Sequence, residues 1–145
     1  MVSGIEASSR WPLVADVDHT WYFKPDGTQL LCSPGDETPS EPCDARPVDI
    51  DIALAIERIN TATTLNLRSV RSSWAGLRTF APDFSMVIGY DSVVPGFFWL
   101  VGQGGTGIQT APAAAQLTAD LMTDADLAGW RGLIDLEQLG PERFA

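Results

Sequence analysis

The alternation of apolar and polar positions in the first third of the chain predicts short strands. Residues 12–23 (PLVADVDHTWYF) read as two strands separated by a break at Asp18–His19, where His19 is a turn residue rather than a base. Residues 24–28 (KPDGT) combine proline, aspartate and glycine as tight turns do, and residues 29–32 (QLLC) return as a strand. These segments together predict a β-hairpin.

An amphipathic helix is predicted after a proline-rich loop. The apolar positions repeat at the spacing of one helix face: Val48, Ile52, Ile56 and Ile59. Pro47 suits the first turn, Asp49 and Asp51 favour the positive end of a helix, and Asn60 is the predicted stop. The two aspartates therefore fit helix capping better than acid–base chemistry.

The second half of the chain predicts more strands and a final helix. Residues 65–73 alternate in part, residues 74–84 read as a strand edge with a turn, and residues 85–91 form a further strand. Residues 96–103 (GFFWLVGQ) are apolar almost throughout, so we expect this strand to be buried on both faces. An alanine-rich helix over 110–122 should pack closely against a neighbour. The predicted fold class is α+β.

Composition and charge exclude several classes of function. A net charge of −10 provides no basic stripe for nucleic acid or for an anionic membrane surface. The longest apolar run, Val93 to Val101, contains proline and glycine and is too short to cross a bilayer. The first residues lack the charge and apolar run of a signal peptide, so we expect a cytoplasmic protein. A disulfide between Cys32 and Cys43 is the alternative to the reduced thiols that this compartment favours. With one histidine and no CxxC pair, a metal site is not predicted.

The glycine-rich turn between the last strand and the last helix is the first candidate site. Its glycines leave most of the turn without Cβ atoms, so the backbone can approach a ligand closely: Gly102, Gly104, Gly105 and Gly107. No Walker A lysine is present, and we do not interpret the turn as the G-x-G-x-x-G fingerprint. A ligand cradle and a tight turn with glycines for packing both fit this pattern.

Two side chains elsewhere are further candidates. Arg78 lies in the apolar stretch WAGLRTF, where its guanidinium needs a carboxylate or phosphate from a ligand or from one of the chain's 19 acidic residues. Tyr22 lies in an aromatic strand, where core or edge packing is the simpler explanation. No nucleophile–histidine–acid constellation stands out, because it would depend on His19.

In combination, these motifs resemble a known family. Residues 74–113 (WAGLRTFAPDFSMVIGYDSVVPGFFWLVGQGGTGIQTAPA) are similar to the C-terminal part of the FAD-dependent amine and amino-acid oxidoreductases of the D-amino-acid oxidase superfamily. Residues 13–34 and 62–76 resemble the preceding stretch in D-arginine dehydrogenase-like members, and glycine oxidase is a second similar member. The motif ERF at 142–144 matches the usual end, so the resemblance runs from about Arg10 to Phe144.

The resemblance implies a division between two domains. Residues 1–92 would belong to the substrate-binding domain, with a mixed or antiparallel sheet and an amphipathic helix. Residues 93–145 would supply the strand, glycine loop and helix that complete a Rossmann-like FAD domain. The N-terminal G-x-G-x-x-G motif and ribose-binding acid of that domain are not found before them. We therefore expect the FAD site to be incomplete in this chain and FAD to bind weakly to it alone.

The resemblance also assigns roles to residues. Tyr22 would contact the substrate, Arg78 would pair with the substrate carboxylate, and the Gly105 carbonyl would accept from the substrate amine. The backbone along the flavin pyrimidine would comprise Gly104, Gly105, Thr106, Gly107, Ile108 and Gln109. Close relatives often carry tyrosine at the position of Thr106, which affects substrate choice. Hydride would pass from the amino-acid Cα to FAD.

Two function hypotheses follow. In the first, the residues are part of an FAD-dependent D-amino-acid dehydrogenase or oxidase that acts on an amino-acid substrate. In the second, this chain is a catalytically inactive fragment or subunit that associates with itself or with a separate FAD-binding chain. The second hypothesis follows from the missing dinucleotide half, because a strand and helix without their sheet expose apolar surface.

Overall fold

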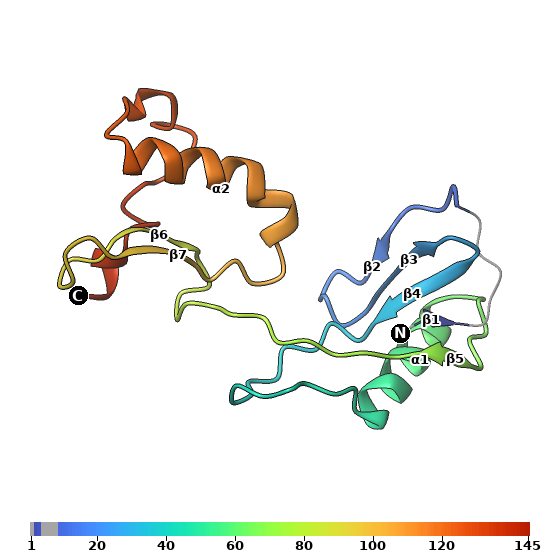
Figure 1. Cartoon of the computed structure of the whole chain (residues 1–145). Coiled ribbons are helices and arrows are strands. Elements are labelled where there is room, and N and C mark those ends of the chain that lie inside the picture. Colours follow the sequence, from blue (N-terminus) through green and yellow to red (C-terminus); the bar gives the residue numbers. More distant parts are fainter. Residues whose placement is uncertain (1, 4–8) are drawn as a thin grey trace. The chain divides into compact units, whose positions relative to one another are not determined.

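A computed structural model of the chain describes residues 2–3 and 9–145 (Figure 1). It contains two compact units, Met1–Leu77 and Arg78–Ala145, which we describe separately as the first and second units. Small antiparallel sheets and two longer helices confirm the predicted α+β class. The predicted division at residues 92 and 93 concerns the domains of the family's complete enzymes and stays a prediction, as does the Rossmann-like character of the second part.

The first unit contains a five-stranded antiparallel sheet with the order β2-β3-β4-β1-β5. Its strands are β1 (Val2–Ser3), β2 (Val14–Ala15), β3 (Tyr22–Asp26), β4 (Gln29–Ser33) and β5 (Val70–Ser72). The predicted hairpin is confirmed, since β3 pairs with β4 and Gly27 takes a φ of +61° in the turn. His19 also lies in a turn, with a φ of +57° and its N–H donating to the carbonyl of Asp16 at 3.1 Å.

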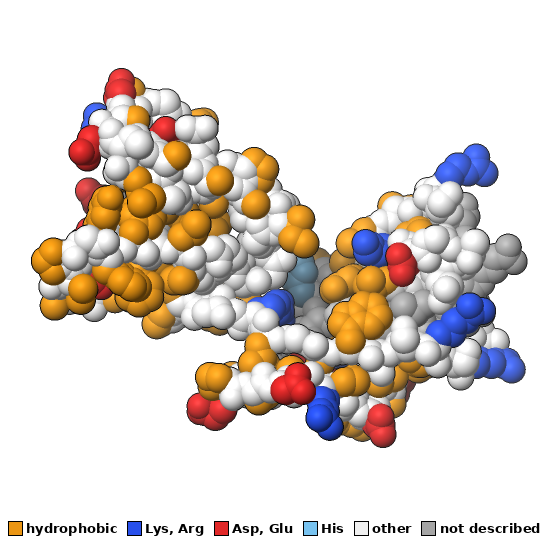
Figure 2. All heavy atoms as spheres, in the orientation of Figure 1, with side chains coloured by type: hydrophobic (Ala, Val, Ile, Leu, Met, Phe, Trp, Pro, Cys, Tyr) orange, Lys and Arg blue, Asp and Glu red, His pale blue; other side chains and the backbone are white. Residues whose placement is uncertain are grey.

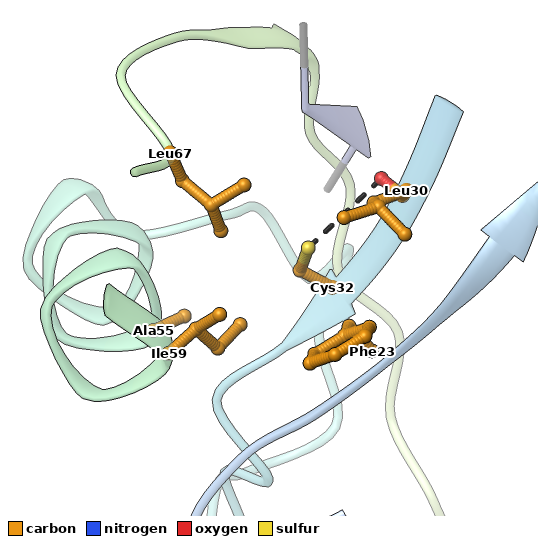
Figure 3. Packing of buried hydrophobic residues seen from close by; sticks show 6 residues of the cluster. All are labelled: Phe23, Leu30, Cys32, Ala55, Ile59 and Leu67. Atoms are coloured by element: carbon orange, nitrogen blue, oxygen red, sulfur yellow. Dashed lines mark hydrogen bonds between the residues drawn. The ribbon is translucent and has the colours of Figure 1, made fainter. Parts of the chain in front are cut away.

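Helix α1 (Asp49–Ala62) packs against the sheet through the predicted apolar face. The buried core of the first unit is shown in Figure 3 and comprises Phe23, Leu30, Cys32, Ala55, Ile59 and Leu67. Ile52 and Ile56 pack against this core, whereas Val48 precedes the helix and is exposed. The 3.6-residue period therefore predicted the helix and the side that it buries.

Asn60 does not end the helix as predicted, because its side chain has a different partner. Its Nδ2 donates to the carbonyl of Leu67 at 3.0 Å, and its Oδ1 accepts from the Leu67 N–H at 2.6 Å. This pair of hydrogen bonds satisfies the backbone of a loop that returns past the helix. The helix continues to Ala62.

The strands predicted over 65–73 and 74–84 are mostly absent. Only Val70–Ser72 forms a strand, because its neighbour β1 offers two residues for pairing. The segment from residue 73 to residue 81 has no ladder partner among the described residues, and a turn follows in which the Phe84 N–H donates to the carbonyl of Ala81 at 2.9 Å. Alternating side chains alone do not make a strand without an adjacent edge.

The second unit is built on the antiparallel pair β6 (Val87–Tyr90) and β7 (Phe98–Val101), with helix α2 (Gly107–Met122) packed against it. Ile88, Ala114 and Leu117 form its core, as the alanine-rich helix led us to expect. Two short 3-10 helices follow, η1 (Leu127–Gly129) and η2 (Pro141–Phe144). Helix α2 begins three residues earlier than predicted.

The expectation that the strand within 96–103 is buried on both faces is wrong for this structure. In β7, Leu100 is 40% exposed and Val101 is 37% exposed. The reason is that β7 pairs only with β6 among the described residues, and a two-stranded sheet cannot cover both of its own faces. An apolar run of this kind needs additional layers to be buried.

Candidate functional site

The guanidinium of Arg78 lies beside the backbone of Gly105 in the second unit. A Cβ atom placed on Gly105 would come within 3.3 Å of Arg78 Nη1, and both residues are exposed. Arg78 also stacks on Phe80, with its Cζ 5.3 Å from the ring centroid. The fold thus brings together two residues that the resemblance identified separately.

The glycine turn is hydrogen-bonded to the segment that contains Arg78. The Gly104 N–H donates to the carbonyl of Thr79 at 3.0 Å, and Gly104 has a φ of +54°. A Cβ on Gly104 would lie 2.5 Å from Cε1 of Phe80. Glycine is required here both by the backbone conformation and by the aromatic ring packed against it.

The start of helix α2 has no side-chain cap. Thr106 precedes the helix, and its hydroxyl donates to the carbonyl of Gln103 at 2.9 Å instead of capping the helix. The amides at positions 107–109 have no intrahelical acceptor and lie at the positive end of the helix dipole. The side chains of Thr106 and Gln109 are exposed, and Ile108 is 97% exposed. Electronegative atoms of a ligand could approach this end.

The spacing of Gly102, Gly104 and Gly107 matches G-x-G-x-x-G, so the pattern itself does not exclude that fingerprint. The fingerprint also has a characteristic structural context. The fingerprint needs a strand after its helix to form a βαβ unit. In the part of the chain that is described, α2 is followed by η1 and η2 and by no further strand.

Tyr22 belongs to the first unit. It is half-buried at the start of β3 and pairs in register with Ser33 of β4. Its neighbours Trp21 and Phe23 stack with ring centroids 6.0 Å apart. The predicted aromatic strand is therefore confirmed, whereas the substrate contact of Tyr22 stays a prediction.

Asp83, an acidic residue close to Arg78 in sequence, is engaged by a different arginine. Its carboxylate accepts from Arg143 Nε at 2.7 Å, and this hydrogen bond holds the pKa of Asp83 below its ordinary value. Asp91 likewise accepts from the indole Nε1 of Trp99 at 2.9 Å, which lowers the pKa of Asp91. Both carboxylates therefore serve the local structure of the second unit.

Two surface hollows lie away from these residues. One hollow, of about 760 Å³, is lined by residues 131–137 of the second unit. The other, of about 530 Å³, is in the first unit near His19 and Arg58, whose Nη1 donates to the carbonyl of Thr20 at 2.9 Å. Residues 2–3 and 9–145 contain no group of three histidine, cysteine or acidic side chains placed to hold a metal ion.

Sequence reasoning missed Phe80. The signal was available, because an aromatic residue two positions after an arginine in an extended segment can lie against the guanidinium. The sequence could not show that the same ring covers Gly104.

Among the described helices, none has the length and apolar character to cross a bilayer.

Comparison with known protein families places the chain in a class of enzymes. The family model described as FAD dependent oxidoreductase, DAO, matches residues 3–121. This match covers most of the 145 residues, and the chain belongs to the DAO family.

The residues present fit one part of the FAD that the family implies. Gly105 and Gly107 carry no Cβ, so their backbone can lie against a flat ring on the sides that Arg78 and Gln103 do not occupy. The amides that begin α2 suit a ring edge that gains negative charge. The residues that would hold this edge are those of the turn and the first helical residues, 104–109.

Proposed function

We propose that this chain forms the substrate-anchoring and flavin-facing part of an enzyme that oxidises the CH–NH bond of D-amino acids or related amines. The observation that carries the proposal is the Arg78 guanidinium beside Gly105. A guanidinium binds a carboxylate through two parallel hydrogen bonds. A backbone carbonyl at Gly105 accepts a hydrogen bond from an amine. Together they hold an amino acid by its two α-substituents.

The reaction removes a hydride from Cα and a proton from nitrogen, which leaves an imino acid that water hydrolyses to a keto acid and ammonia. FAD, when bound, accepts the hydride. Arg78 holds the carboxylate and Gly105 orients the nitrogen, so that Cα faces the turn. The amides of residues 107–109 stabilise negative charge beside the turn.

Two further positions would shape the choice of substrate. Tyr22 is a substrate-binding residue in this proposal, as the resemblance implies. Thr106 is smaller than the tyrosine that close relatives often carry, which leaves more room for a substrate side chain. D-arginine dehydrogenase and glycine oxidase are the members on which these assignments are based. The cytoplasmic location expected from the sequence belongs to the same proposal.

The test is dye reduction by the purified chain supplied with FAD and a panel of D- and L-amino acids. FAD is supplied in excess, because we expect it to bind weakly to this chain alone. Under that condition we expect D-amino acids to reduce the dye through FAD and Arg78→Ala to lower this activity about 10- to 100-fold, as loss of charge-assisted hydrogen bonds implies. Arg131→Ala is the matched control, because Arg131 is an exposed arginine of the same unit away from the turn. Equal activity of the two variants would contradict the role of Arg78.

A second candidate function is that of an inactive fragment or subunit that associates with itself or with an FAD-binding chain. Figure 2 shows hydrophobic side chains gathered over β6 and β7 of the second unit. The exposed ones include Val94, Phe97, Leu100 and Val101. A colourless protein that stays inert with added FAD and elutes as an oligomer supports this candidate. A yellow, active monomer rules it out.

A further inference from the structure

We propose that Phe80 is a positioning residue that holds the Arg78 guanidinium beside Gly105. The inference rests on the proposed function, because it gives Arg78 the task of binding a carboxylate. It adds a residue that touches no substrate itself. The ring of Phe80 acts on the substrate through the arginine that it orients.

The first support is the position of the Phe80 ring against Arg78. The guanidinium Cζ lies 5.3 Å from the ring centroid, within the range of a cation–π contact. The exposed side chain of an arginine otherwise samples many rotamers, and ordering it on binding costs conformational entropy. A ring that already orders the side chain reduces that cost. Arg78 is thereby prepared to bind before a ligand arrives.

The second support is the packing of Phe80 against the glycine turn. A Cβ on Gly104 would lie 2.5 Å from Phe80 Cε1 and 3.0 Å from Cδ1, so the ring covers the Cα of this glycine. The Gly104 N–H bonds the carbonyl of Thr79, the residue between Arg78 and Phe80. The ring therefore fixes the distance between the arginine segment and the turn.

Phe84 holds the Phe80 ring from another side. The two ring centroids are 5.3 Å apart with an interplanar angle of 51°. Phe80 remains 36% exposed, and its ring lies against Arg78, Phe84 and Gly104. An aromatic ring is needed at this position, because an aliphatic side chain offers no negative π-face to a cation.

The experiment compares the wild-type chain with Phe80→Leu and Phe80→Tyr by NMR, following the Arg78 Nε–H resonance. The probes are D-alanine, which carries a carboxylate, and D-alaninamide, which does not. The indole N–H resonances of Trp99 and Trp130 report folding, since they bond Asp91 at 2.9 Å and Asp120 at 2.8 Å. If Phe80→Leu moves both indoles, Phe80→Met replaces it.

We expect the Arg78 resonance to lose its ring-current shift in Phe80→Leu and the Kd for D-alanine to rise about two- to fivefold. Phe80→Tyr should behave as wild type. An unchanged Kd in Phe80→Leu, with D-alanine still preferred over D-alaninamide, overturns the positioning role and leaves the proposed function intact. Equal response of Arg78 to both probes in the wild type overturns the carboxylate anchor itself and the positioning role with it.

Discussion

Arg143 donates to both carboxylate oxygens of Asp83, from Nε at 2.7 Å and from Nη2 at 3.2 Å. The same guanidinium donates to the backbone carbonyls of Gly140, Ser85 and Met86 at 2.9 to 3.1 Å. Its side chain is only 13% exposed. One arginine in η2 therefore fastens the C-terminal segment to the loop that leads from the Arg78 segment into β6.

We predict that Arg143→Ala destabilises the second unit. Each backbone hydrogen bond lost costs about 1 kcal/mol, and each kcal/mol lowers the Tm of a small unit by about 4–8 °C. Arg143→Lys should recover only part of the loss, because an ammonium cannot donate to two oxygens in a fixed plane. Thermal unfolding followed by tryptophan fluorescence measures the effect.

Arg46→Ala is the control for that experiment. Arg46 approaches Asp44 at 3.9 Å, and both side chains are almost fully exposed. Such surface pairs contribute little to stability. A Tm loss in Arg46→Ala as large as that in Arg143→Ala would contradict the importance of the Arg143 contacts.

The Asp83 carboxylate predicts a dependence of stability on pH. The hydrogen bond from Arg143 lowers the pKa of Asp83 from its ordinary value of 3.8. A carboxylate with a lowered folded-state pKa contributes stability above the unfolded-state value, and this contribution is lost as the pH falls through the folded-state pKa. Wild type should therefore exceed Asp83→Asn in stability at neutral pH, and the difference should shrink below about pH 4. Urea unfolding curves at a series of pH values measure this difference. If the difference in unfolding free energy between wild type and Asp83→Asn stayed constant with pH, the predicted role of the Asp83 carboxylate would be refuted.

Two glycines with positive φ provide a comparison that isolates the effect of the Phe80 ring. Gly96 has a φ of +80° and no atom within 4 Å of the point where a Cβ would lie, whereas Gly104 has a φ of +54° and the Phe80 ring at that point. Alanine in this conformation costs about 1–2 kcal/mol at either site. Gly104→Ala should cost clearly more than Gly96→Ala and should also broaden or shift the Arg78 resonance. If urea unfolding gave the same loss of unfolding free energy for both variants, the Phe80 ring would move aside at no cost and the prediction would be wrong.

The two cysteines should differ in reactivity. Cys32 is buried in the first unit, and burial raises the pKa of its thiol to about 11, whereas Cys43 is exposed. The thiolate is the reactive form, so iodoacetamide near neutral pH should label Cys43 and spare Cys32. In guanidinium chloride the chain unfolds, so both cysteines should be labelled. Rapid labelling of Cys32 in the native chain, measured by mass spectrometry, would be inconsistent with this core.

Local patterns predicted the elements that depend on neighbours in the chain. The hairpin of β3 and β4 follows from a turn of proline, aspartate and glycine between two apolar segments. Helix α1 follows from apolar residues on one face, and the stop predicted at Asn60 lies two residues before the observed end at Ala62. The combination of motifs around Arg78 and the glycine turn also sufficed to recognise the family, which the match over 3–121 supports.

Tertiary structure decided what depends on residues far apart in the sequence. The sequence placed Arg78 and Gly105 in separate motifs, and only the chain path puts one beside the other with Phe80 against both segments. The Asn60 side chain bonds Leu67 rather than ending α1, and the apolar strand β7 remains half exposed for want of further layers. Periodicity reports which side of an element is apolar. Which partner meets that side, or whether any does, is settled by packing between distant segments, and this is what local sequence does not encode.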